Sequence, residues 1–140
     1  MNTTFILQYV MSFFTTLFVL TYLLKVPHYI TNQYAIVNEY YNKHFVKNVP
    51  LDFIFVFLYL QVGYFVINML NIKKILYKLL IIIITTILLT SGFCFYYRSY
   101  PMTSSFFSRW FHNAGYSSAL YDGILLAFVY LGIEYLKKTI

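Results

Sequence analysis

Residues 79–97 read LLIIIITTILLTSGFCFYY and contain no charged side chain. An uncharged stretch of this length matches the roughly 20 residues that a helix needs to cross about 30 Å of hydrocarbon. Its many β-branched residues do not argue for a strand, because a segment in a bilayer must satisfy its own backbone hydrogen bonds, and only helices and closed barrels do so. The stretch therefore predicts a transmembrane helix.

Three other stretches have the same character, so the chain is predicted to be a single transmembrane domain, 1–140, built as a bundle of four transmembrane helices. The first span is expected to stay in the mature protein, because no Lys or Arg precedes it and no small-residue cleavage site follows it. Asn48 and Pro50 are residue types suited to the start of the second span. The predicted spans are 5–24, 51–72, 79–97 and 115–136.

The composition supports an all-α integral membrane protein. Of the 140 residues, 61% are hydrophobic and only 10% are charged, whereas a soluble domain carries roughly 25% charged residues. A soluble domain of this size could not bury so much apolar surface in one core, since about a third of its surface stays in water. The excess of Phe, Tyr, Ile, Asn and Lys is typical of an AT-rich genome, such as that of a large DNA virus or a protist mitochondrion.

Two stretches between the spans, 28–47 and 103–113, are predicted to lie on the membrane surface as amphipathic helices. In the first, apolar residues recur every three or four positions beside polar ones. In the second, aromatic residues stand among Ser, Arg and His, which suits rings at headgroup depth. The apolar stripe of the first comprises Ile30, Tyr34, Val37, Tyr41 and Phe45, and the interfacial anchors of the second are Phe106, Phe107, Arg109 and Trp110.

The positive charge of the chain is predicted to flank the membrane. The net charge of +6 comes from Lys and Arg residues dispersed beside hydrophobic segments, so the expected partners are the lipid bilayer and other membrane proteins or further copies of the chain, and not nucleic acid. Four spans place both termini and the turn around Lys73 and Lys78 on one side. Lys and Arg divide equally between the two sides, and the tighter clustering on the terminal side favours that side as the positive-inside face.

Asp122 is the most distinctive polar residue, because it lies within the fourth span. A carboxylate there costs a few kcal/mol unless it finds a partner or a proton, and such residues often mark ion or proton paths. The preferred interpretation is an interhelical hydrogen bond that fixes packing, and a conducted ion or proton is the alternative. The polar residues expected to reach it are Ser118 one turn earlier, Gln61 and Asn68 on the second span, and Thr85, Thr86, Thr90 and Ser91 on the third.

A stripe of small residues runs down the fourth span at every fourth position. It comprises Gly115, Ala119, Gly123 and Ala127. Small residues in register let a neighbouring helix approach the backbone closely. The stripe therefore predicts a packing surface, whose partner helix belongs either to this chain or to another.

The remaining polar residues give no sign of catalysis. Glu134 is expected to pair with Lys137 or Lys138, three and four residues later, and the lone Cys94 is expected to pack as a small hydrophobe. The four carboxylates are scattered along the sequence, so no acid/base pair is expected. The chain has no HExxH, CxxC, phosphate-binding glycine loop or GxSxG motif. We therefore expect a protein that is not an enzyme.

The three histidines, His28, His44 and His112, all fall on the side opposite the termini. None has the short ligand spacing of a preformed metal site. They are interpreted as interfacial histidines, and no metal and no cofactor are expected.

The C-terminal third resembles a pattern found in short multi-span membrane proteins of nucleocytoplasmic large DNA viruses. The residues that carry the resemblance are SSFFSRWF at 104–111, AGY at 114–116 and YDG at 121–123. The resemblance implies a viral source and a location in a membrane, such as the internal membrane of the virion. It leads us to expect a non-enzymatic structural or assembly role there.

Gly115 followed by Asp122 is also similar to the G-x6-D spacing of the membrane-anchor subunits of succinate dehydrogenase. In those subunits a haem-binding histidine stands four residues before the glycine. Phe111 occupies that position here, and His112 is one residue out of register, so haem is not expected. This second resemblance implies an accessory subunit of a respiratory complex in the mitochondrial inner membrane, and a small ion or proton channel using Asp122 is the third alternative.

Overall fold

The computed structural model describes residues 3–139, and every regular element within that range is helical. The long elements are α1 (Thr3–Leu17), its π-helical continuation η1 (Phe18–Leu23), α4 (Phe45–Leu70), α5 (Ile75–Arg98) and α7 (Ser117–Thr139). The short elements are α2 (Val26–Thr31), α3 (Tyr34–Asn38), the π-helical η2 (Glu39–Lys43) and α6 (Phe106–Ala114). Residues 1, 2 and 140 of the predicted domain lie outside the described residues.

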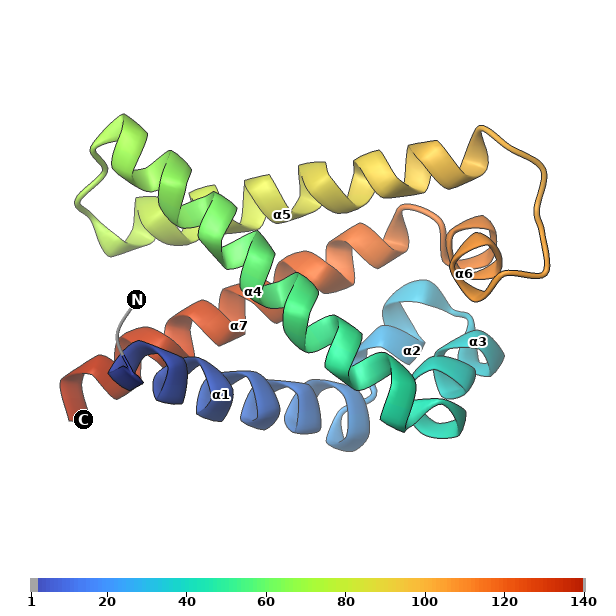
Figure 1. Ribbon diagram of the computed structural model, residues 1–140, viewed down its shortest axis with the longest axis horizontal. Coiled ribbons are helices and arrows are strands. Elements are labelled where there is room, and N and C mark those ends of the chain that lie inside the picture. Colours follow the sequence, from blue (N-terminus) through green and yellow to red (C-terminus); the bar gives the residue numbers. More distant parts are fainter. Residues whose placement is uncertain (1–2, 140) are drawn as a thin grey trace.

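Within residues 3–139, four helical stretches are long and apolar enough to cross a membrane. They are Thr3–Leu23, Val46–Leu70, Ile75–Arg98 and Ser117–Lys138. The predicted all-α class is confirmed, and these four stretches agree with an integral membrane protein. The start of α1, the end of α7 and the turn between α4 and α5 lie at one end of the bundle, and the short helices α2, α3 and α6 lie at the other (Figure 1). We call these the terminal end and the α6 end.

Helix α7 forms the centre of the bundle. It runs between α1 and α5, and α4 crosses the other helices at an angle (Figure 1). Half of the most apolar part of α7 is buried inside the protein, whereas the corresponding fraction is 22% for α4 and 22% for α5. Leu126, Val129 and Ile133 of α7 have no exposed surface, so this helix supplies much of the core, while α4 and α5 keep broad apolar surfaces exposed.

Two hydroxyl contacts join α7 to the first span. Ser12 donates a hydrogen bond of 2.6 Å to the carbonyl oxygen of Val129, and the hydroxyls of Thr21 and Tyr121 lie 2.7 Å apart. Ser12 also lies against Gly132, where a side chain would displace it. Because apolar tails offer no competing partner, such contacts fix the register of two helices in a membrane.

The predicted stripe of small residues packs against α5 of the same chain. A Cβ atom added at Gly123 would lie 3.1 Å from Cγ1 of Ile87 and 3.7 Å from Cγ2 of Ile83. Ala119, one turn earlier, is buried as well. The sequence left open whether the partner helix belongs to this chain or to another. At Gly123 the partner is α5 of this chain.

Gly115 lies in the turn between α6 and α7, not within the fourth span as predicted. Its φ of 62° and ψ of −147° fall in a region that is essentially restricted to glycine. The guanidinium group of Arg98 lies against it and donates to the carbonyl oxygens of Phe111 (3.0 Å) and His112 (3.2 Å). Arg98 thus binds two carbonyl groups in the last turn of α6, one of which, that of Phe111, also accepts the backbone N–H of Gly115 at 3.1 Å.

The predicted surface helix 28–47 is divided into separate pieces. Asn32 adopts a left-handed conformation with φ 54°, which ends α2, and α4 already begins at Phe45. Within the predicted stripe, Val37 and Tyr41 are buried in the protein while Tyr34 is 45% exposed, so the apolar residues do not share one membrane-facing side. The side chain of Phe45 lies outside the described part of the structure.

Helix α4 also begins earlier than the predicted start at residue 51, so Pro50 lies inside it. The side chain of Asn48 does not cap a helix there, because its amide group donates to the carbonyl oxygen of Tyr40 at 3.2 Å. This contact attaches the first turn of α4 to η2. Pro50 is the sixth residue of α4, beyond the first four whose N–H groups lack helical partners, so its missing N–H removes one intrahelical hydrogen bond.

We expect Gly123→Leu to destabilise the protein by about 1–3 kcal/mol, because the larger side chain would push α5 away from α7. Thermal unfolding in detergent measures the effect. Gly92→Leu on α5 is the matched control, since nothing lies within 4 Å of a Cβ atom at that exposed position. Equal stability of the two variants would contradict close packing at Gly123.

Candidate functional site

A cavity lies between α4, α5 and α7. Helices α4 and α5 separate toward the α6 end of the bundle (Figure 1). The volume of the cavity is about 130 Å³, close to the roughly 150 Å³ of an engineered cavity that holds benzene. Its walls come from α4, α5 and α7, and η2 and α6 cover its end. Of its 14 lining residues, nine are aromatic, three are aliphatic and two are acidic, so the few polar groups define its chemistry.

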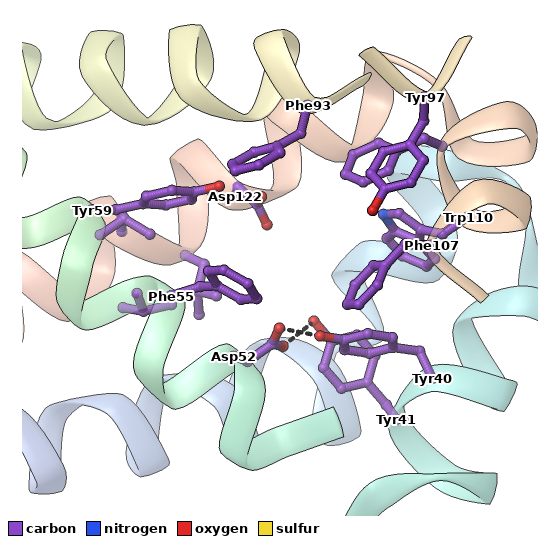
Figure 2. A pocket seen from close by; sticks show the side chains of 14 residues that line it. Tyr40, Tyr41, Asp52, Phe55, Tyr59, Phe93, Tyr97, Phe107, Trp110 and Asp122 are labelled. Atoms are coloured by element: carbon purple, nitrogen blue, oxygen red, sulfur yellow. Dashed lines mark hydrogen bonds between the residues drawn. The ribbon is translucent and has the colours of Figure 1, made fainter. Parts of the chain in front are cut away.

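Two carboxylates from different helices point into this cavity (Figure 2). Asp52 comes from α4 and Asp122 from α7. Asp52 stands six residues after Val46, and Asp122 five residues after Ser117, where their spans begin, so both lie about 8–9 Å along their helices. Among the described residues, neither carboxylate forms an ion pair with a Lys, Arg or His side chain. Two acidic groups thus share one space without a basic partner.

Two tyrosines of η2 hold Asp52. The hydroxyl of Tyr40 donates to one carboxylate oxygen, and that of Tyr41 donates to the other at 2.9 Å. Burial, followed by the negative charge of Asp52, raises the pKa of both tyrosines well above the ordinary value of 10. Both therefore remain O–H donors over the ordinary pH range.

Thr90 is the predicted partner that reaches Asp122. Its hydroxyl donates to Oδ2 of the carboxylate at 2.7 Å and lies 3.5 Å from the hydroxyl of Tyr59. The bond connects α5 to α7 across the cavity wall.

The other predicted partners are used differently. Ser118 donates instead to the carbonyl oxygen of Gly115 at 2.7 Å, Asn68 is exposed, and Gln61 is half-buried. Neither amide side chain forms a hydrogen bond to Asp122 among the described residues. Asp122 therefore has one of the seven expected partners.

Aromatic rings surround the space between the two carboxylates (Figure 2). Phe55 is 36% exposed and Phe93 is 43% exposed, so the wall between α4 and α5 reaches the outer surface of the bundle. Trp110 and Phe111 of α6 are buried at the opposite wall. The nine rings are those of Tyr40, Tyr41, Phe55, Tyr59, Phe93, Tyr97, Phe107, Trp110 and Phe111.

The residues predicted as interfacial anchors mainly contact the protein itself. Trp110 is only 8% exposed, and its ring lies 5.5 Å from that of Tyr40, as does Phe106 at 5.1 Å. Phe107 lines the cavity. Trp110 is buried while Phe106 and Phe107 are half-buried, because the aromatic side of α6 packs on η2. Their position at the headgroups stays a prediction.

An ion pair between distant parts of the chain fastens α6 to η2. The guanidinium group of Arg109 donates to both carboxylate oxygens of Glu39, at 2.6 and 2.8 Å. These hydrogen bonds hold the pKa of Glu39 below its ordinary value of 4.5. A two-point contact of this kind also fixes orientation, so it holds the end of the cavity in place.

Asp52 was not recognised from the sequence as part of a site. The four carboxylates are scattered along the sequence, but folding brings two of them, Asp52 and Asp122, into one cavity. A signal was available: Asp52 lies inside the predicted second span, where an ionisable residue marks a functional site. Nothing in the local sequence indicates that Tyr40 and Tyr41 bind it.

The histidines do not gather at the cavity. His28 contacts the amide oxygen of Asn38 at 2.8 Å, and His112 contacts the carbonyl oxygens of Ser108 (2.8 Å) and Tyr100 (3.0 Å). His44 lies 3.9 Å from Glu39. Within residues 3–139, no three His, Cys, Asp or Glu side chains are grouped as metal ligands.

We expect acid to release α6 from η2. The Glu39–Arg109 pair stabilises the protein fully above pH 4.5, the ordinary pKa of Glu39, and this contribution is lost as the pH falls through the lowered pKa. Trp110 is the only tryptophan in the chain, so its fluorescence should report the release. Glu39→Gln should remove this acid step, whereas Glu134→Gln, which alters the exposed pair with Lys137, should keep it. Identical acid titrations of wild type and Glu39→Gln would contradict the assignment.

Comparison with known proteins finds no similar protein. No protein-family model matches the chain, no curated protein matches it, and no solved structure matches it. The cavity must therefore be interpreted from its own residues.

Proposed function

We propose that the protein is a membrane protein without enzymatic activity that binds a small cation between Asp52 and Asp122. The observation that carries the proposal is the pair of carboxylates that point into one cavity without a basic partner among the described residues. Charge inside a membrane is costly unless it is compensated. A bound cation would compensate the negative charge of the carboxylates, and a proton on a carboxylate would do so when no cation is bound.

The position of the cavity suits binding from one side of the membrane. Both carboxylates lie in the part of their spans nearest the α6 end, about 8–9 Å along helices that cross about 30 Å of hydrocarbon. Asp122 thus keeps the ion-binding role considered for it from the sequence, and Asp52 joins it. A carrier or a receptor would use such a site to take up its cation.

A structural or assembly role is the second candidate, and the hydroxyl contacts of the carboxylates favour it. The Thr90–Asp122 bond joins α5 to α7, and the Tyr41–Asp52 bond joins η2 to α4. Polar contacts of this kind can fix helix packing without binding any ligand. For this role we propose a viral membrane, following the resemblance of residues 104–123, with an accessory subunit of a mitochondrial respiratory complex as the alternative.

Titration with cations in detergent tests the first proposal against the second. We expect at least one salt from a panel of sodium, potassium, calcium and tetramethylammonium chlorides to change the fluorescence of Trp110 in a saturable way. Asp52→Asn and Asp122→Asn should each weaken that response by at least about tenfold, since losing one charged partner in a buried site costs more than about 1.4 kcal/mol.

Glu134→Gln is the matched control, because it removes a carboxylate of α7 that pairs with Lys137 at 3.2 Å instead of facing the cavity. This variant should bind as the wild type does. Calorimetry of the same samples provides a second readout. If folded wild-type protein binds none of the four cations, the cation-binding proposal is wrong and the structural role is favoured.

A further inference from the structure

We infer that the cation is an organic ammonium group, held between the two carboxylates by the aromatic rings of the cavity. This inference rests on the proposed cation-binding function and concerns the chemical class of its ligand. The observation that carries it is the nature of the wall. Nine of the 14 lining residues carry aromatic rings, which come from η2, α4, α5 and α6.

An aromatic wall recognises an alkylated ammonium group better than it recognises a bare metal ion. The face of an aromatic ring attracts a cation through its quadrupole, and several rings together form the cages that bind quaternary ammonium groups. The methyl or methylene groups of such a cation also bury apolar surface against the rings. The two carboxylates then supply the countercharge that the rings lack.

The donor set and the size of the cavity disfavour an inorganic ion. Calcium takes six to eight oxygen ligands at about 2.3–2.6 Å, and magnesium requires a near-octahedral set. Asp52 and Asp122 each already accept hydrogen bonds from hydroxyl groups. The other side-chain oxygen atoms of the wall are the hydroxyls of four tyrosines, two of which already donate to Asp52. A space of about 130 Å³ is much larger than a bare ion and is close to the roughly 150 Å³ that accommodates benzene.

The side wall of the cavity gives the ammonium group a route from the membrane. Phe55 and Phe93 both line the cavity and are exposed on the outside of the bundle, at 36% and 43%. They stand on α4 and α5, which separate at this level (Figure 1). An ammonium group could therefore come from a lipid headgroup or from a free amine in water, and the chemistry of recognition is the same.

The first test compares choline with its uncharged isostere, in which a tert-butyl group replaces the trimethylammonium group. We expect choline and tetramethylammonium to change the fluorescence of Trp110 in a saturable way in wild-type protein, and the isostere to bind at least about tenfold more weakly, since it lacks the charge. Equal binding of choline and the isostere would show an apolar pocket and overturn the ammonium assignment.

The second test removes single rings from the wall. Phe55→Leu and Phe93→Leu change side chains that are partly exposed, so the fold should tolerate them. Each should weaken tetramethylammonium binding by about three- to tenfold, the equivalent of roughly 0.7–1.4 kcal/mol for one ring. Phe95→Leu is the matched control on α5, because Phe95 is 68% exposed and lies outside the cavity. Unchanged affinity in both cavity variants would contradict a role for the rings.

The experiments distinguish failure of the ammonium assignment from failure of the cation-binding proposal. Saturable binding of sodium, potassium or calcium without binding of tetramethylammonium overturns the organic ligand but keeps the cation site. No binding of any cation overturns both.

Lipid nanodiscs identify the source of the group once tetramethylammonium is seen to bind in detergent. Weaker binding in phosphatidylcholine than in phosphatidylglycerol supports competition by a lipid headgroup. Equal binding in the two lipids supports a free amine. Both results support the ammonium site.

Discussion

Two glycines let α7 lie in close contact with α1 on one side and α5 on the other, because Gly132 accommodates Ser12 and Gly123 accommodates Ile87. In a bilayer there is no hydrophobic gain from bringing apolar helices together, so close packing and buried hydrogen bonds must hold them. These contacts occupy two sides of α7. Helix α4 then packs near α5 at the turn and diverges from it along the bundle, and this divergence opens the cavity beside Asp122.

Aromatic residues line the cavity between the diverging helices. Tyrosine combines a large ring with a hydroxyl group, so it can both fill a wall and bind a carboxylate inside an apolar region. Tyr40 and Tyr41 do this for Asp52, while Phe and Trp rings complete the wall. Two carboxylates and nine aromatic rings line this cavity, which is why cation binding is the function that we propose.

The sequence predicted the number and type of the long helices, since uncharged stretches of membrane-spanning length permit little else in a bilayer. It predicted helix ends less well. Pro50 is typical of a helix start, yet Asn48 binds Tyr40 and the helix extends back to Phe45. For the site, Thr90 was among the expected partners of Asp122, because both lie within spans. The position of Asp52 in a predicted span was a usable signal. Its contacts with Tyr40 and Tyr41, and the contact of Trp110 with Tyr40, could not be predicted, because they depend on how η2 packs against α4 and α6.

The ion pair between Glu39 and Arg109 also sets an order of assembly. Glu39 precedes α4 in the chain and Arg109 follows α5, so during synthesis the first partner emerges well before the second. Arg109 can meet Glu39 only after α4, α5 and α6 have all been synthesised, so the contact that holds the end of the cavity in place forms late.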